Sequence, residues 1–314
     1  MLKAIVLGAA AGGGFPQWNS NAPACRRARA GDGKARPRTQ ASLAVSADGR
    51  RWLLLNASPD LRQQIEATPA LQPSRGLRSS PIAGVALTGA DVDAIAGLLH
   101  MRERQPFAVY ASERVHAVLR ANAIFEVLAP DVVAREIVSL DEPFEPRDAD
   151  GSSLGLTLEL FEVPGKVALY LEGDASARTL AGRRGDNVGI EVRAKGAAGT
   201  AMARLLFIPG CAGVTDALRA RLEGAAALFF DGTLWTDDEM IRAGLGAKTG
   251  LRMGHMSIGG AGGTMAALRD VAPARRIFIH INNSNPVLLD DSPERANVEA
   301  SGWEIAYDGM EIEI

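Results

Sequence analysis

The sequence is poor in cysteine, in long apolar runs and in signals for export. Two cysteines, Cys25 and Cys211, occur among 314 residues, so a disulfide framework is excluded and a reducing compartment is indicated. No run approaches the roughly 18 consecutive apolar residues of a membrane helix. The first residues, MLKAIVLGAAAGGG, have no separate basic region and no cleavage motif, so we expect no signal peptide and a cytoplasmic protein.

The chain also lacks a strong excess of charge of either sign. Thirty-four basic and thirty-seven acidic residues give a net charge of −3, which argues against a general nucleic-acid binder. Hydrophobic residues make up 47% of the chain and charged residues 23%, as in globular proteins and unlike disordered chains. We expect no nucleic-acid partner and no membrane partner. A homodimer is compatible with the sequence, which does not fix the oligomeric state.

Short apolar strands alternate with helical stretches along the chain. The pair Asp48-Gly49 separates two apolar stretches, as in a tight hairpin, and hairpins imply mixed sheets. Runs such as ALFF (227–230) are typical of strands buried on both faces. We therefore predict one layered α/β/β/α domain over residues 1–314. The predicted strands are 1–7, 41–46, 51–56, 84–88, 107–112, 156–163, 167–172, 187–192, 204–210, 227–232 and 277–283, with helices at 58–64, at 95–102 and after Ser112.

Acidic and histidine side chains lie at the ends of several predicted strands. Asp91 and Asp93 follow strand 84–88, Asp231 ends the apolar run 227–230, His255 lies in a loop, and His280 lies within strand 277–283. Strand ends converge on a crevice in layered α/β proteins, and carboxylates with imidazoles suit zinc, iron or manganese. Each residue has an ordinary alternative: Asp93 as a helix cap, Asp91 and Asp231 as turn residues, and His280 as a hydrogen-bonded core histidine.

Other polar motifs point less directly to chemistry. His116 is expected to be structural or solvated, and His100 lies about 10 Å along its helix from Asp93, too far to share an ion. The glycines at 8 and 12–14 lack the Lys-Ser/Thr pair of a phosphate-binding loop and are expected to allow tight backbone packing. Cys211 has no histidine close in sequence, so it is not expected to be a nucleophile.

Basic residues are concentrated in one short N-terminal loop. A solvated loop accounts for most of them, and Arg38 is the expected exception because PRTQ leads straight into a strand. Guanidinium groups bind carboxylates in a bidentate manner, so a small anionic substrate would use such a residue. The six basic residues are Arg26, Arg27, Arg29, Lys34, Arg36 and Arg38.

Many motifs together resemble the PqqB family of pyrroloquinoline quinone (PQQ) biosynthesis proteins, in order and over essentially the whole chain. They are GGGFPQWN (12–19), RPRTQASLAVS (36–46), WLLLNASPDLRQQI (52–65), VPGKV (163–167), FIPGCA (207–212), FFDGTLW (229–235), RMGHMS (252–257), HINNSNPVL (280–288), DSPERA (291–296) and AYDGM (306–310). The resemblance implies a metallo-β-lactamase-like αββα sandwich. It also implies iron-dependent hydroxylation of the tyrosine ring of a Glu–Tyr-derived precursor, with other PQQ-pathway proteins as partners. An older interpretation of the family is transport of PQQ or its precursor.

The chain departs from the family pattern at two expected metal sites. Where relatives with this fold read H-x-H-x-D-H, residues 89–94 read GADVDA, so Asp93 survives and the following histidine is replaced by Ala94. Members of the family carry a C-x-C-x-x-C zinc knot. In this chain its first two cysteines are replaced by Ser20 and Ala22, and only the third remains, as Cys25. One thiolate cannot supply about four ligands, so we predict no structural zinc there.

Two functional hypotheses remain open. In the first, His255 and His280 with Asp93 or Asp231 hold Fe(II), with zinc as another candidate metal, and catalyse hydroxylation. By their positive charge, Arg38, Arg62 and Lys166 would then hold substrate carboxylates. In the second, the metal site is lost and the protein binds or carries PQQ or its precursor. Hydrolysis at a two-zinc centre is disfavoured because few histidines remain.

Overall fold

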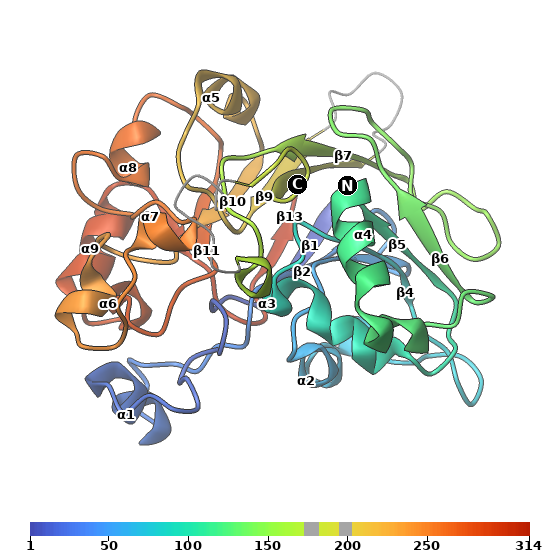
Figure 1. Ribbon diagram of the computed structural model, residues 1–314, viewed down its shortest axis with the longest axis horizontal. Helices are drawn as coiled ribbons and strands as arrows, with labels where there is room; N and C mark the ends of the chain where they lie inside the picture. The colour runs from blue at the N-terminus through green and yellow to red at the C-terminus, as the bar shows by residue number, and fades with distance from the viewer. Residues whose placement is uncertain (173–181, 195–202) are drawn as a thin grey trace.

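Two mixed sheets form the centre of the molecule. The computed structural model describes residues 1–172, 182–194 and 203–314 (Figure 1). The first sheet has the strand order β13-β1-β2-β3-β4-β5-β6, with parallel pairing from β3 to β6 and antiparallel pairing among the others. Its strands are β1 (Lys3–Gly8), β2 (Ser42–Ser46), β3 (Trp52–Leu55), β4 (Ile82–Ala86), β5 (Phe107–Ala111), β6 (Val133–Ile137) and β13 (Glu311–Glu313).

The second sheet has the order β12-β11-β10-β9-β8-β7. Strands β9 to β12 run parallel, whereas β7, β8 and β9 pair antiparallel. Its strands are β7 (Leu156–Glu162), β8 (Val188–Ala194), β9 (Arg204–Ile208), β10 (Ala227–Asp231), β11 (Arg276–Ile279) and β12 (Glu304–Ile305).

Helices cover the outer faces of both sheets. Figure 1 shows α2 and α4 beside the first sheet, and α5 to α9 at the other end of the molecule beside β9 to β11. The α-helices are α1 (Pro23–Arg29), α2 (Leu61–Ala67), α3 (Val92–Ile95), α4 (Glu113–Ala121), α5 (Asp216–Leu222), α6 (Glu239–Arg242), α7 (Gly250–Met253), α8 (Thr264–Ala267) and α9 (Pro293–Ala300). The 3-10 helices are η1 (Pro69–Leu71), η2 (Ala96–Met101), η3 (Ala123–Val127), η4 (Leu169–Leu171) and η6 (Pro286–Leu288). Among the described residues, no helix has the length and apolar character to cross a membrane.

Three separate apolar cores explain this layering. Alternate residues of a strand face opposite sides of its sheet. Accordingly, Leu53 of β3 and Phe229 of β10 belong to the core between the sheets. Leu54 packs on the outer side of the first sheet with Leu61 and other helix residues. Phe230 packs on the outer side of the second sheet. Apolar side chains on both faces account for the apolar runs in the sequence, and the predicted αββα sandwich is confirmed.

Some local predictions were wrong. Residues 167–172 do not form a strand: Leu169 to Leu171 form η4, and these three apolar side chains are exposed at 61%, 44% and 45%. The helix predicted at 95–102 begins earlier, as α3, and continues as η2. His280 is not inside a strand, because β11 ends at Ile279 and His280 has a φ of 59°. An apolar pattern does not show whether a segment has a neighbouring strand to pair with. Residues 167–172 have the pattern of a strand but no sheet partner.

Phe229 tests the core between the sheets. Its side chain is fully buried, so Phe229→Ala is expected to lower the free energy of unfolding by about 3–5 kcal/mol through lost contacts and the resulting cavity. Urea denaturation followed by circular dichroism measures this change. The control Ile124→Ala removes an apolar side chain that is 63% exposed and should change stability by about 0.5 kcal/mol or less. Similar effects of the two substitutions would contradict the layered core.

Candidate metal centre

A cavity of about 630 Å³ lies where the loops that follow four strands meet. Its lining includes Asp93 from the segment after β4, Gly210 after β9, Thr233 after β10, and His280 after β11. His255, which follows α7, completes this set. The carboxyl ends of β9, β10 and β11 lie at one sheet edge because these strands are parallel, and such edges are the usual ligand sites of α/β folds.

Asp231 is the buried anchor of these loops. It is the last residue of β10 and is fully buried. Oδ2 accepts hydrogen bonds from the Cys211 amide at 2.8 Å and from His255 Nδ1 at 2.7 Å. Oδ1 accepts from the Thr233 amide at 3.0 Å and from Thr233 Oγ1 at 2.6 Å. These four donors fix the carboxylate and join three loops around it.

The bond to Asp231 determines which nitrogen of His255 faces a ligand. A carboxylate oxygen accepts the hydrogen bond, so His255 carries its hydrogen on Nδ1. Within the described part of the chain, no hydrogen-bond partner occupies Nε2, and His255 lines the cavity. Nε2 therefore has a lone pair available for a metal or a substrate proton. This carboxylate–imidazole arrangement is the one that orients metal-binding histidines.

His280 is held between Asp93 and Thr233. Its Nε2 lies 2.8 Å from Asp93 Oδ2, and its Nδ1 lies 2.8 Å from Thr233 Oγ1. Burial alone would lower the pKa of His280, but the hydrogen bond and charge of Asp93 outweigh burial and raise it. Burial would likewise raise the pKa of Asp93, but the hydrogen bond and charge of His280 lower it. The two groups therefore stabilise each other as an ion pair.

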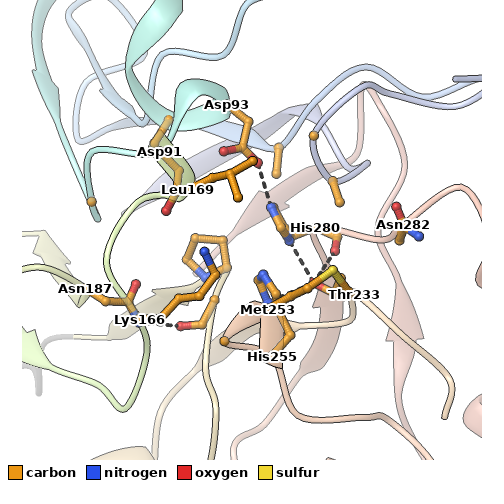
Figure 2. A pocket seen from close by; sticks show the side chains of 18 of the residues that line it. Asp91, Asp93, Lys166, Leu169, Asn187, Thr233, Met253, His255, His280 and Asn282 are labelled. Atoms are coloured by element: carbon orange, nitrogen blue, oxygen red, sulfur yellow. Dashed lines mark hydrogen bonds and ion pairs between the residues drawn. The ribbon is translucent and has the colours of Figure 1, made fainter. Parts of the chain in front are cut away.

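Thr233 connects the two histidines and was not predicted as a site residue. Its Oγ1 lies 3.1 Å from His255 Nδ1 as well as next to Asp231 and His280. The two imidazole rings stack with centroids 5.1 Å apart and an interplanar angle of 20° (Figure 2). The only sequence signal for Thr233 is its position in the FFDGTLW motif, two residues after Asp231.

The residues present suit a single metal ion. Asp231, His255 and His280 each offer one ligand atom, and these atoms lie within 4.8 Å of one another. Asp93 adds a carboxylate oxygen beside His280. Ala94 lines the same cavity but offers no ligand atom. The structure thus brings three of the four residues predicted to bind metal within 4.8 Å of one another, and the fourth, Asp93, contacts His280. Two imidazoles with carboxylates form the ligand type of iron and zinc sites.

Asp91 also belongs to the cavity, rather than to a solvated turn. Its Oδ1 accepts a hydrogen bond from the Leu169 amide at 3.3 Å. Burial raises the pKa of Asp91, and the neighbouring charge of Asp93 raises it further. Figure 2 shows both carboxylates on the same side of the pocket as Leu169. Asp91 adds negative charge at the centre without a hydrogen bond to either histidine among the described contacts.

The predicted substrate-binding residues are separated by the structure. Arg38 is 4% exposed and donates to the backbone oxygens of Ala306 and Arg36, and burial lowers its pKa to about 10. Arg62 is exposed on α2, and neither arginine lines the cavity. Lys166 does line it. The structure therefore does not place Arg38 and Arg62 where the prediction requires them, because Arg38 serves the fold instead.

The remaining candidates lie outside the centre, as expected. His100 is exposed and His116 is buried, with its Nε2 2.9 Å from the Glu136 carbonyl oxygen. Burial raises the pKa of Cys211 to about 12, which disfavours a nucleophilic thiolate. Cys25 is buried, with Sγ 3.6 Å from Asn283 Oδ1. That no structural zinc binds at Cys25 stays a prediction.

Comparisons with known proteins agree with this architecture. The family model described as the beta-lactamase superfamily domain matches residues 51–281. Coenzyme PQQ synthesis protein B of Gluconacetobacter diazotrophicus is 57% identical over 312 residues, covering 99% of both chains. A protein of that name from Methylorubrum extorquens is 53% identical over 313 residues, covering 100% of both chains.

Solved structures give the same result. The Zn²⁺-bound PqqB from Methylobacterium extorquens matches with a TM-score of 0.92 and 52% identity, covering 99% of this chain and 100% of that chain. A diphosphatase of the PhnP family matches with a TM-score of 0.66 and 18% identity over 100% of this chain and 97% of that chain. At that identity, the second likeness shows the fold alone.

The Asp93–His280 pair predicts a defined pH dependence in metal-free protein. Its contribution to the free energy of unfolding is present between the ordinary pKa values of aspartate, 3.8, and histidine, 6.5. The contribution is lost as pH rises through the raised pKa of His280 and as pH falls through the lowered pKa of Asp93. In Asp93→Asn, His280 should titrate at lower pH than in the wild type. NMR titration of the imidazole signals measures this, and the His116 signal should not move. An unchanged His280 midpoint would contradict the pairing.

Proposed function

Because the chain belongs to the coenzyme PQQ synthesis protein B family of the β-lactamase superfamily, we propose that it serves PQQ synthesis as a metal-dependent hydroxylase. The observation that carries this proposal is the convergence of His255, His280 and Asp93 on one cavity, with the buried carboxylate of Asp231 close to both histidines behind its wall. The substrate is the tyrosine ring of a Glu–Tyr-derived precursor of PQQ. The same centre would use Fe(II) for this reaction.

His255 and His280 are the imidazole ligands in this proposal, and Asp93 is the favoured carboxylate. Asp231 already accepts four hydrogen bonds, whereas Asp93 accepts from the side chain of His280. Asp231 then acts mainly by holding His255 with Nε2 toward the cavity, and it remains the alternative carboxylate ligand. Zn²⁺ would suit the same groups by their ligand chemistry. A 52%-identical relative is Zn²⁺-bound.

The metal, when bound, supplies activation of molecular oxygen at open coordination positions. Hydroxylation inserts one oxygen atom into an aromatic C–H bond. It consumes one O₂, two electrons and two protons, and it releases one water, so an external two-electron donor is required. The protein's own groups bind and orient the ring in the cavity. Lys166 lines the cavity and would pair its positive charge with a substrate carboxylate.

A non-catalytic binding protein for PQQ or its precursor is the second candidate. Ala94 favours it, because a histidine expected beside Asp93 is absent. A cavity of this volume accommodates a drug-sized molecule without any metal. The two functions differ in whether oxygen enters the bound molecule.

Oxygen incorporation distinguishes the two candidates. Full-length protein loaded anaerobically with Fe(II) is exposed to ¹⁸O₂ with a reductant and a synthetic Glu–Tyr-derived substrate. Mass spectrometry should show ¹⁸O in the product, and His280→Ala should reduce its formation by about 100-fold or more through loss of a ligand. His100→Ala, which removes an exposed histidine outside the cavity, should retain activity. A substrate that binds to the iron-loaded protein and gains no oxygen would support the binding function instead.

Ala94→His tests whether one substitution weakened the centre. The new imidazole next to Asp93 is expected to raise Zn²⁺ affinity by about tenfold or more, measured by competition with a chromophoric chelator. Ala94→Leu is the matched control, because it adds comparable bulk without a ligand atom and should not raise the affinity. If Ala94→His binds zinc no more tightly than the wild type, position 94 does not adjoin the metal.

A further inference from the structure

Three basic side chains share one carboxylate at the edge of the candidate metal centre. Lys166 Nζ lies 2.9 Å from Glu172 Oε1, and Lys248 Nζ and Arg252 Nη2 lie 3.2 Å and 3.1 Å from Glu172 Oε2. We refer to Lys166, Lys248 and Arg252 as the basic cluster. Lys166 and Lys248 line the same cavity as His255 and His280. Only Lys166 of the three was predicted from the sequence, since Lys248 and Arg252 are brought to Glu172 by the fold.

The basic cluster is in direct contact with the segment that carries His255. Gly254, the preceding residue, has a φ of 90°, and a Cβ built on it would lie 2.9 Å from Lys166 Cγ. The aliphatic part of Lys166 therefore packs on the backbone next to His255. Figure 2 shows Lys166 beside His255 in the pocket. A ligand group bound by the cluster would thus be within one small molecule's length of the imidazoles.

The charges of the cluster are not balanced within the described structure. Three cations contact the carboxylate of Glu172, and Lys166 also interacts with the charge of Asp91, so three positive charges face two negative ones. Burial would raise the pKa of Glu172, but its ion pairs lower it to about 2, so it remains charged. Glu172 is 8% exposed, whereas the side chains of Lys248 and Arg252 are 40% and 39% exposed. Like charges held this close repel one another, so a third cation is not explained by Glu172 alone.

Spare hydrogen-bond donors accompany this excess charge. Among the described residues, Lys248 and Arg252 each contact a carboxylate only at Glu172 Oε2. A lysine ammonium has three donors and a guanidinium has five, so most of their donors are left for another acceptor. Carboxylates are the acceptors that fit such a lysine–arginine pair, and arginine can bind them through two parallel hydrogen bonds.

We propose that the basic cluster is a subsite for substrate carboxylates, which selects an aromatic polycarboxylic acid and presents its ring to His255 and His280. This inference rests on the proposed function for the identity of the reacting ring. Glu172 holds the three cations together in the absence of ligand. Charge complementarity would then favour molecules with at least two carboxylates over neutral aromatic compounds.

Binding of PQQ, used as a tricarboxylate probe, tests the subsite in the full-length protein stripped of metal by a chelator. Equilibrium dialysis should show a Kd for Lys248→Ala and for Arg252→Ala that is at least about tenfold higher than for the wild type. The controls are Lys3→Ala and Arg120→Ala, which remove similarly exposed side chains paired with one glutamate each, outside the cavity. Both controls should bind as the wild type does. Esterified PQQ, without its negative charges, should bind weakly to all of them.

Glu172→Gln distinguishes a carboxylate-binding role of the cluster from a purely structural one, since only the first predicts tighter ligand binding in this variant. Removing the internal carboxylate should tighten PQQ binding several-fold, even if it lowers thermal stability. The proposal is overturned if the wild type does not bind PQQ, if Lys248→Ala and Arg252→Ala bind within twofold of the wild type, or if Glu172→Gln binds no more tightly. These binding measurements involve no metal and no turnover. They can therefore support the carboxylate subsite even if the protein is not a hydroxylase, and they can contradict the subsite even if it is one.

Discussion

The carboxylate of Asp231 is the constraint on which the site depends. A buried charge is tolerated only when donors surround it, and here two backbone amides, a hydroxyl and an imidazole do so. Those donors come from three separate segments, after β9, after β10 and after α7. The hydrogen bonds to this one carboxylate therefore bring three loops together and turn Nε2 of His255 toward the cavity.

The orientation of the histidines is consequently independent of residue 94. His255 is fixed by Asp231, and His280 is fixed by Thr233 and Asp93. The family resemblance leads us to expect a histidine where Ala94 stands, and the hydrogen bonds that hold His255 and His280 do not involve residue 94. An alanine at this position therefore leaves both imidazoles held as they are.

Much of the architecture could be predicted because it depends on local patterns. Apolar runs such as that of β10 indicated strands buried on both faces, and the polar end of that run located Asp231. Arg38 could not be assigned from the sequence, since its partner is the backbone of Ala306, far away along the chain. Lys248 and Arg252 were missed for the same reason: only the tertiary structure brings them to Glu172. Residues 167–172 were misassigned because an apolar pattern typical of a strand found no sheet partner.

The central claim is that this cavity still holds one metal ion despite Ala94. Anomalous diffraction at the iron edge, from crystals of protein reconstituted anaerobically with Fe(II), tests it most directly. The account predicts about one iron per chain and one anomalous peak within ligand distance of His255, His280 and either Asp93 or Asp231. Iron well below one equivalent, or a peak away from these side chains, would contradict it and leave a cavity that binds its ligand without a metal.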